Sequence, residues 1–173
     1  MERLLLIVCI AAFVSCKTEP KQSENISDEK KLPEKVITIP SYTYETLEPL
    51  LHKEDDKTYV INFWATWCKP CVEELPAFEK LNATYKNQNV EVILVSLDFQ
   101  NQIEKRVIPF IQENNIQSEV VIMVDPDQNT WIPKISKKWS GAIPATLIYN
   151  KHKREFYEQS FTYELLQNEL KKF

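Results

Sequence analysis

The most informative stretch of the sequence is NFWATWCKPCVEELP, residues 62 to 76. Its two cysteines, Cys68 and Cys71, follow a run of β-type residues and precede a helical run. The run KTYVINFW, residues 57 to 64, is β-branched and aromatic and has no charge after its first residue, as expected for a strand buried on both faces. Pro70 fits the first turn of the helix that follows, because the missing N–H of proline costs nothing there. The sequence therefore places the cysteine pair at a strand-to-helix junction.

The rest of the chain alternates between strand and helix patterns. This order predicts parallel strands with helices on both faces of the sheet, and a final antiparallel strand pair across a tight turn. Strands are expected at residues 36–39, 57–64, 90–97, 120–124, 145–149 and 155–159. Helices are expected at 44–53, from the cysteine pair to about Lys86, at 102–114 with a kink at Pro109, at 131–139 after Pro133, and at about 162–172. A chain of 173 residues suits one domain of this kind.

The N-terminal segment predicts export. Its apolar run from Leu4 to Val14 is too short to span a bilayer, which takes about 20 residues, but suits the apolar region of an export signal. The ending FVSC resembles a bacterial lipobox, which implies a lipid anchor on Cys16; a plain secretory signal and an uncleaved anchor are the alternatives. The next residues are rich in Lys, Glu, Ser and Pro and predict a flexible tether. The expected organisation is a lipoprotein signal peptide at 1–16, a tether at 17–35 and a globular domain at 36–173.

Charge and glycine content argue against two classes of partner. The net charge is -4, and no basic block is longer than KHKR at 151–154, so no nucleic-acid partner is expected. The single glycine, Gly141, does not allow a glycine-rich phosphate cradle, so nucleotide binding has no support. A monomer without cofactor is the expectation.

The cysteine pair could be a metal site, a structural bridge or a redox centre. In an exported chain Cys9 leaves with the signal and Cys16 is blocked by lipid. Zinc needs three or four ligands, and the histidines, His52 and His152, are single and distant, so no metal ion is expected. A bridge between residues three apart closes too small a loop to add much stability. Redox chemistry is the remaining interpretation.

The two thiols are expected to differ in role. The N–H groups and dipole at the start of a helix favour a thiolate, which lowers the pKa of Cys68 from about 8.5 toward 7 or below. Cys68 is therefore the expected nucleophile. Cys71, one helical turn further on, is suited to attack the mixed disulfide that Cys68 forms with a partner.

The segment FWATWCKPC resembles the active-site segment of the thioredoxin superfamily. The preceding asparagine and the following EELP are most similar to the exported, TlpA/ResA-like thiol:disulfide oxidoreductases. The resemblance covers about residues 36–173. It implies an α/β, thioredoxin-like fold, with a central mixed β-sheet flanked by helices, an N-terminal strand extension, and an αβ insertion at 102–124.

The resemblance also implies substrate-binding residues. GAIPATLIY, residues 141–149, matches the cis-proline loop of the superfamily. The Ile143–Pro144 bond is therefore expected to be cis and to pack beside the cysteines, with the Ile143 backbone free to pair with a bound peptide. Trp67, directly before the nucleophile, is expected to offer an exposed aromatic surface to a partner.

One position departs from cytoplasmic thioredoxins, whose buried aspartate is replaced by Asn62. An amide cannot exchange a proton at neutral pH, so another acid is needed to deprotonate Cys71. Glu74 lies three residues beyond Cys71 and matches the glutamate that the exported branch uses near its cysteines. The alternative is that Glu74 only favours the helix N-terminus by its charge.

The expected function is a periplasm-facing thiol:disulfide oxidoreductase of a Gram-negative bacterium, lipid-anchored through Cys16. It would reduce disulfides of client proteins, as the cytochrome-maturation thioredoxins do, with electrons from a membrane thiol-electron supplier. A thiol oxidant working in reverse is the first alternative. A thiol peroxidase would need Pro-x-x-x-Thr-x-x-Cys, but Ile61 and Ala65 occupy the first two positions. A copper-delivery module would need a CxxxC spacing and a nearby histidine, which are not found.

Overall fold

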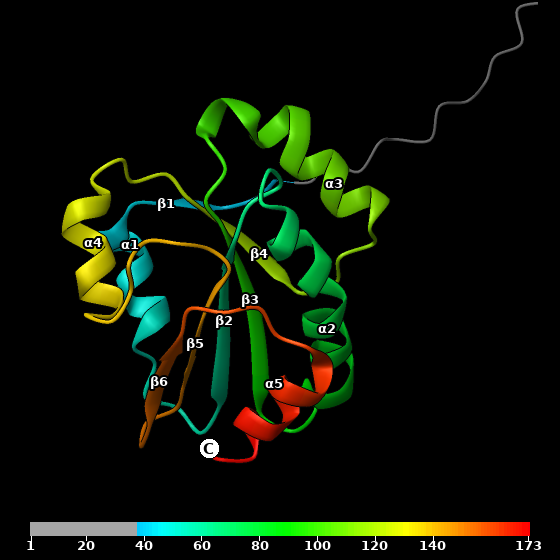
Figure 1. Ribbon diagram of the computed structural model, residues 1–173, viewed down its shortest axis with the longest axis vertical. Helices are drawn as coiled ribbons and strands as arrows, with labels where there is room; N and C mark the ends of the chain where they lie inside the picture. The colour runs from blue at the N-terminus through cyan, green and yellow to red at the C-terminus, as the bar shows by residue number, and fades with distance from the viewer. Residues whose placement is uncertain (1–37) are drawn as a thin grey trace, which may run out of the picture. The chain divides into compact units, whose positions relative to one another are not determined.

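The computed structural model describes residues 38–173. The predicted signal peptide, the lipid anchor Cys16 and the tether lie outside these residues. The described chain forms a six-stranded mixed sheet in the order β1-β4-β3-β2-β5-β6 (Figure 1). Strands β1 to β4 pair in parallel, whereas β5 pairs antiparallel with both β2 and β6. The strands are β1 (Ser41–Tyr42), β2 (Thr58–Trp64), β3 (Val90–Ser96), β4 (Glu119–Met123), β5 (Ala145–Tyr149) and β6 (Arg154–Tyr157).

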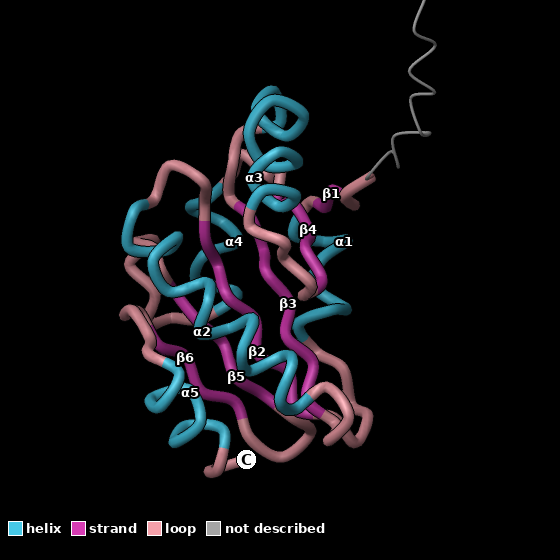
Figure 2. Tube along the Cα trace, turned by 90° about the vertical axis from the view of Figure 1, so that its right-hand side faces the viewer, coloured by secondary structure: helices cyan, strands magenta, loops and turns pink. Residues whose placement is uncertain are grey.

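Helices cover both faces of this sheet, as the alternating pattern predicts. Helices α2 and α5 lie on one face and α1 and α4 on the other (Figures 1 and 2). The α-helices are α1 (Tyr44–Leu47), α2 (Lys69–Tyr85), α3 (Ile108–Glu113), α4 (Gln128–Ile135) and α5 (Tyr163–Leu170). None of the helices in the described part of the chain is long and apolar enough to cross a membrane.

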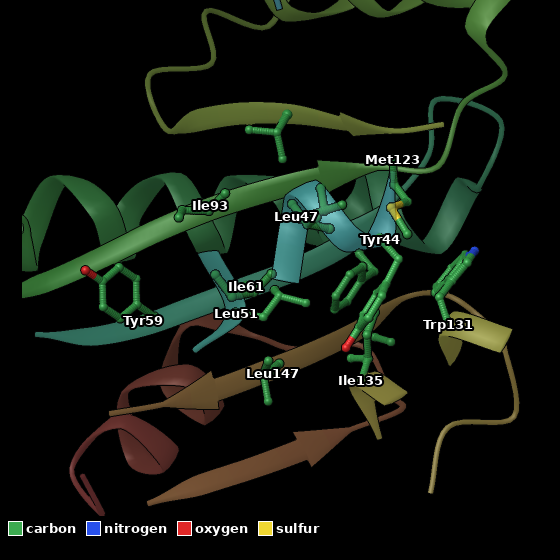
Figure 3. Packing of buried hydrophobic residues seen from close by; sticks show 14 of the residues in the cluster. Tyr44, Leu47, Leu51, Tyr59, Ile61, Ile93, Met123, Trp131, Ile135 and Leu147 are labelled. Atoms are coloured by element: carbon green, nitrogen blue, oxygen red, sulfur yellow. The ribbon is translucent and has the colours of Figure 1, made fainter. Parts of the chain in front are cut away.

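Two cores form because side chains alternate along each strand. On β2, Tyr59, Ile61 and Phe63 pack into the core under α1 and α4, part of which Figure 3 shows. Val60 and Trp64 point the other way and pack under α2 and α5. Asn62 lies between these two on the same strand, so its side chain points toward the α2 side of the sheet.

The first strand differs from its prediction at residues 36–39. The first strand of the described chain is β1, Ser41–Tyr42. Residues 38 and 39, the part of the predicted strand that the structure describes, do not belong to it. Pairing with β4 decides its position, since Pro40 O accepts a hydrogen bond from Ile122 N and Ser41 pairs with Ile122. Hydrophobicity places an apolar segment near a sheet, but the ladder of hydrogen bonds determines which residues form the strand.

Three helices also differ from their predictions. The predicted helix at 44–53 is α1, Tyr44–Leu47, followed by a 3-10 helix at Glu48–Leu51 that holds Pro49 in its first turn. The predicted helix at 102–114 is three consecutive segments: a 3-10 turn at Gln100–Gln102, a π-helix at Ile103–Val107, and α3, which holds Pro109 in its first turn. The predicted helix at 131–139 is α4, which begins at Gln128 and ends at Ile135, so Pro133 lies inside it. Pro133 is the sixth of the eight residues of α4, so in this short helix its missing N–H removes only one helical hydrogen bond, and burial of Trp131 and Ile135 compensates for the loss.

Candidate functional site

The cysteine pair lies where β2 passes into α2. Cys68 is the N-cap residue of α2, and a disulfide joins it to Cys71. The Cys71 backbone N–H donates a hydrogen bond to Cys68 Sγ at 3.3 Å. Cys68 retains 6% of its surface whereas Cys71 is fully buried. A partner can therefore reach only the first sulfur of the pair, and the second is accessible only through it.

The loop before β5 lies directly beside Cys68. Strand β5 pairs antiparallel with β2, with Ala145 opposite Phe63, and this pairing brings the preceding loop to the cysteines. The Ile143–Pro144 peptide bond is cis, which confirms the expectation drawn from the family resemblance. Cys68 Sγ lies 3.7 Å from the Ile143 carbonyl oxygen.

Glu74 is a buried carboxylate within one helical turn of Cys71 on α2. Only 4% of its surface is exposed. Its Oε1 accepts a hydrogen bond from Asn62 Nδ2 at 2.8 Å, and its Oε2 accepts one from the Phe161 backbone N–H at 2.7 Å. Burial raises the pKa of Glu74 to about 7, because these two hydrogen bonds only partly offset the loss of hydration. The carboxyl group can thus exchange a proton near neutral pH.

A second buried carboxylate fixes the loop that precedes Cys68. Asp98, two residues after the end of β3, accepts hydrogen bonds from the Thr66 backbone N–H at 2.9 Å and the Thr66 hydroxyl at 2.6 Å. It also accepts one from the Ser96 hydroxyl at 2.9 Å. The sequence did not reveal this contact, because Asp98 and Thr66 are remote in sequence and meet only when β2 and β3 pair.

We expect Asp98→Ala to lower the free energy of unfolding by about 3 kcal/mol, because it leaves three buried or half-buried donors without an acceptor. Urea unfolding of the oxidised protein measures this. Asp56→Ala is the control, since Asp56 forms only an exposed ion pair with Lys151 and its loss should leave stability nearly unchanged. Equal stability of the two variants would contradict a structural role for Asp98.

Two exposed aromatic side chains lie on the loops that Asp98 ties together. Trp67 is 54% exposed, as the sequence predicts, and Phe99 is 71% exposed. The sequence did not single out Phe99; the available signal was an aromatic residue in the turn that follows a buried strand, three residues after the end of β3.

A model of the AhpC/TSA family matches residues 43–154, which is more than half of the chain. The chain belongs to the AhpC/TSA family. Several curated relatives carry the name thiol-disulfide oxidoreductase ResA. The one from Oceanobacillus iheyensis is 37% identical over 92 residues, which cover 53% of this chain and 43% of that protein. The one from Bacillus cereus is 30% identical over 150 residues, which cover 86% of this chain and 79% of that protein. The chain spans about half the length of several curated relatives that it matches.

One solved structure resembles the fold of this chain. The thioredoxin-related protein from Neisseria meningitidis serogroup B matches 69% of this chain and 85% of that chain, with a TM-score of 0.58 and 21% sequence identity. This likeness and the sheet order confirm the expected fold class, an α/β thioredoxin-like fold with a mixed sheet flanked by helices.

The expected site residues within the described part of this AhpC/TSA domain come from two segments of the chain, residues 67–74 and residues 143–144. Cys68 contacts the carbonyl of Ile143, which precedes Pro144, while Glu74 is buried further along α2. The structure adds Asn62, Thr146 and Phe161, which contact Glu74 directly or through Asn62. The expected lipid anchor, Cys16, is outside the described residues.

Proposed function

We propose that this domain is a thiol:disulfide oxidoreductase that reduces disulfides in client proteins through Cys68 and Cys71. The observation that carries the proposal is the disulfide at the N-terminus of α2, with one sulfur at the surface and the other buried. The names of the curated relatives support the same class of reaction. Cys68 is the proposed nucleophile because a helix N-terminus stabilises a thiolate.

The proposed cycle starts from the dithiol form. The Cys68 thiolate attacks one sulfur of a client disulfide, forms a mixed disulfide, and releases the other client sulfur as a thiolate. The Cys71 thiolate then attacks Cys68 Sγ and releases the second client sulfur. Two electrons pass to the client, which gains two thiols after protonation, and the domain is left with the Cys68–Cys71 disulfide.

Glu74 has a proposed role in the second step. Cys71 must lose its proton to attack, and a carboxylate three residues further along the same helix face is placed to take it. The pKa of about 7 supports this role, because a group with that pKa is about half ionised at neutral pH. Glu73, by contrast, is exposed and pairs with Lys69 at 3.6 Å.

The client would bind across the surface around Cys68. The Ile143 carbonyl beside the sulfur supports backbone pairing with an extended client segment, with Pro144 closing the site. The exposed rings of Trp67 and Phe99 would contact apolar side chains near the client disulfide.

The proposed location is the periplasmic side of a membrane in a Gram-negative bacterium. The FVSC sequence supports lipidation of Cys16, and residues 17–35 would tether the domain to the membrane. A thiol-electron supplier in that membrane would restore the dithiol, and proteins undergoing cytochrome c maturation are one candidate class of client. The reverse reaction, oxidation of client thiols, uses the same residues.

The experiment that tests the function is capture of a client by Cys71→Ser. Without the second sulfur, the mixed disulfide cannot be resolved. We expect the reduced variant to accumulate a covalent complex with a disulfide-containing protein, on a non-reducing gel, in at least about tenfold excess over the unsubstituted protein. The double variant Cys68→Ser, Cys71→Ser is the control and should capture nothing.

Absence of the complex with reduced, folded Cys71→Ser would contradict the proposal. A peroxide-consumption assay on the unsubstituted protein separates the thiol peroxidase alternative. Peroxide turnover without reduction of any protein disulfide would favour that alternative.

A further inference from the structure

Glu74 is surrounded by hydrogen-bond donors. Its Oε2 faces the backbone N–H of Phe161, which can only donate. Its Oε1 faces Asn62 Nδ2, which also can only donate. This arrangement suits the ionised carboxylate. The protonated acid must donate one hydrogen bond itself, and neither neighbouring nitrogen can accept it.

The missing acceptor is present on the same amide. Asn62 Oδ1 is buried and has no hydrogen-bond partner among residues 38–173. A half-turn of the Asn62 amide about its Cβ–Cγ bond exchanges the positions of Oδ1 and Nδ2. Because the Phe161 N–H is fixed by the backbone, the proton of Glu74 belongs on Oε1, where the turned amide would present Oδ1.

We propose that Asn62 is a positioning residue for Glu74 that binds the carboxylate through Nδ2 and, after its amide turns over, binds the protonated acid through Oδ1. This inference rests on the proposed proton-accepting role of Glu74. It gives the asparagine at this position a function that aspartate could not perform, since an ionised aspartate can accept from the protonated acid but cannot donate to the ionised carboxylate, which it would repel.

Thr146 allows both orientations of the amide. It is the cross-strand partner of Asn62 on β5, and its hydroxyl oxygen is 3.2 Å from Asn62 Nδ2. A hydroxyl can accept from Nδ2 in one orientation and donate to Oδ1 in the other. The Ala145 carbonyl oxygen can only accept, but at 3.5 Å from Nδ2 it binds weakly.

Each orientation leaves one end of the amide without a partner. In the observed state it is Oδ1; in the turned state it would be Nδ2. Because both carry a similar desolvation penalty, the proton on Glu74 decides which orientation is lower in free energy.

Few other groups influence Glu74. Among residues 38–173, the hydrogen-bonding neighbours of its carboxyl are Asn62 on β2 and the Phe161 backbone in the segment before α5. No charged side chain of β2, β5 or α5 forms a hydrogen bond or ion pair with it in that part of the chain. Cys68 and Cys71, at the start of α2, do not titrate while they are disulfide-bonded.

The test uses nuclear magnetic resonance on the oxidised protein without any client. The Glu74 carboxyl carbon is titrated from about pH 5 to 9, while the Overhauser contact between the Asn62 Nδ2 protons and the Thr146 methyl group is followed. We expect this contact to weaken severalfold on acidification, with the same midpoint as Glu74. A contact that stays constant while Glu74 titrates would overturn the proposal, because Asn62 would then be a fixed donor.

A variant gives a second readout. Asn62→Leu removes both ends of the amide, and the ionised form loses the stronger, charge-assisted bond. We expect the Glu74 midpoint to rise by about one pH unit. Asn87→Leu, which removes an exposed amide just beyond α2, should leave the midpoint unchanged. An unchanged midpoint in folded Asn62→Leu would also overturn the proposal.

These measurements are independent of thiol exchange. If the amide turns over but no client disulfide is reduced, the proposed function fails while the inference about Asn62 stands. If clients are reduced but the amide stays fixed, only the inference about Asn62 fails.

Discussion

Replacing Cys68 with serine is expected to lower the rate of protein-disulfide reduction at least about a thousandfold, to the background rate. A serine hydroxyl is not ionised near neutral pH, so it cannot replace a thiolate as nucleophile. Cys71 cannot compensate, because it is fully buried behind Cys68. The rate is measured with a disulfide-linked model protein and a chemical dithiol as electron source.

Cys71→Ser is the matched control for this variant. It makes the same chemical change one helical turn further along, but retains the nucleophile, so its first step should proceed and stop at the mixed disulfide. Both variants lose the disulfide, and any stability effect of that loss is therefore common to them. A Cys68→Ser protein that keeps more than about a tenth of the rate would show that another group attacks the client.

The strand-to-helix junction could be predicted from sequence because its signals are local. The uncharged β-branched run ends at Trp64, and Pro70 marks the first turn of α2, so both elements are defined within a few residues. Strand β1 and helix α4 depend on distant partners instead. Ser41 is a strand residue because β4 lies beside it, and α4 continues through Pro133 because its neighbours are buried.

In the site, too, the local features could be predicted from sequence and the contacts with distant segments could not. The spacing of Cys68 and Cys71, together with Glu74 one turn further, follows from one helix. The partners that determine the behaviour of Glu74 come from elsewhere: the Phe161 N–H reaches it from the segment before α5, and Thr146 supports Asn62 from β5. These contacts exist only after the sheet has formed, so no local pattern encodes them.

Glu74→Gln is expected to make the protein more stable and less active at pH 8. Burial raises the pKa of Glu74 from 4.5 to about 7 in the folded protein. The folded protein therefore holds this proton more tightly than the unfolded chain does, and the stabilisation by the proton is lost as pH rises through about 7. Glutamine cannot ionise, so the free energy of unfolding of the variant should exceed that of the unsubstituted protein by up to about 3 kcal/mol at pH 8. At pH 4 the two proteins should differ little.

The same substitution should slow the release of client roughly a hundredfold at pH 8, because glutamine cannot take the proton of Cys71. Urea unfolding of the oxidised protein at pH 4 and pH 8 gives the stability, and decay of the mixed disulfide gives the rate. Glu73→Gln is the matched control, since Glu73 is exposed on the same helix turn and should change neither quantity. If Glu74 served only to favour the helix N-terminus by its charge, Glu74→Gln would be less stable at pH 8 and its rate would be unchanged. The opposite signs of the stability change separate the two roles, because a charge that stabilises the helix and a buried charge that opposes folding cannot both dominate at one carboxylate.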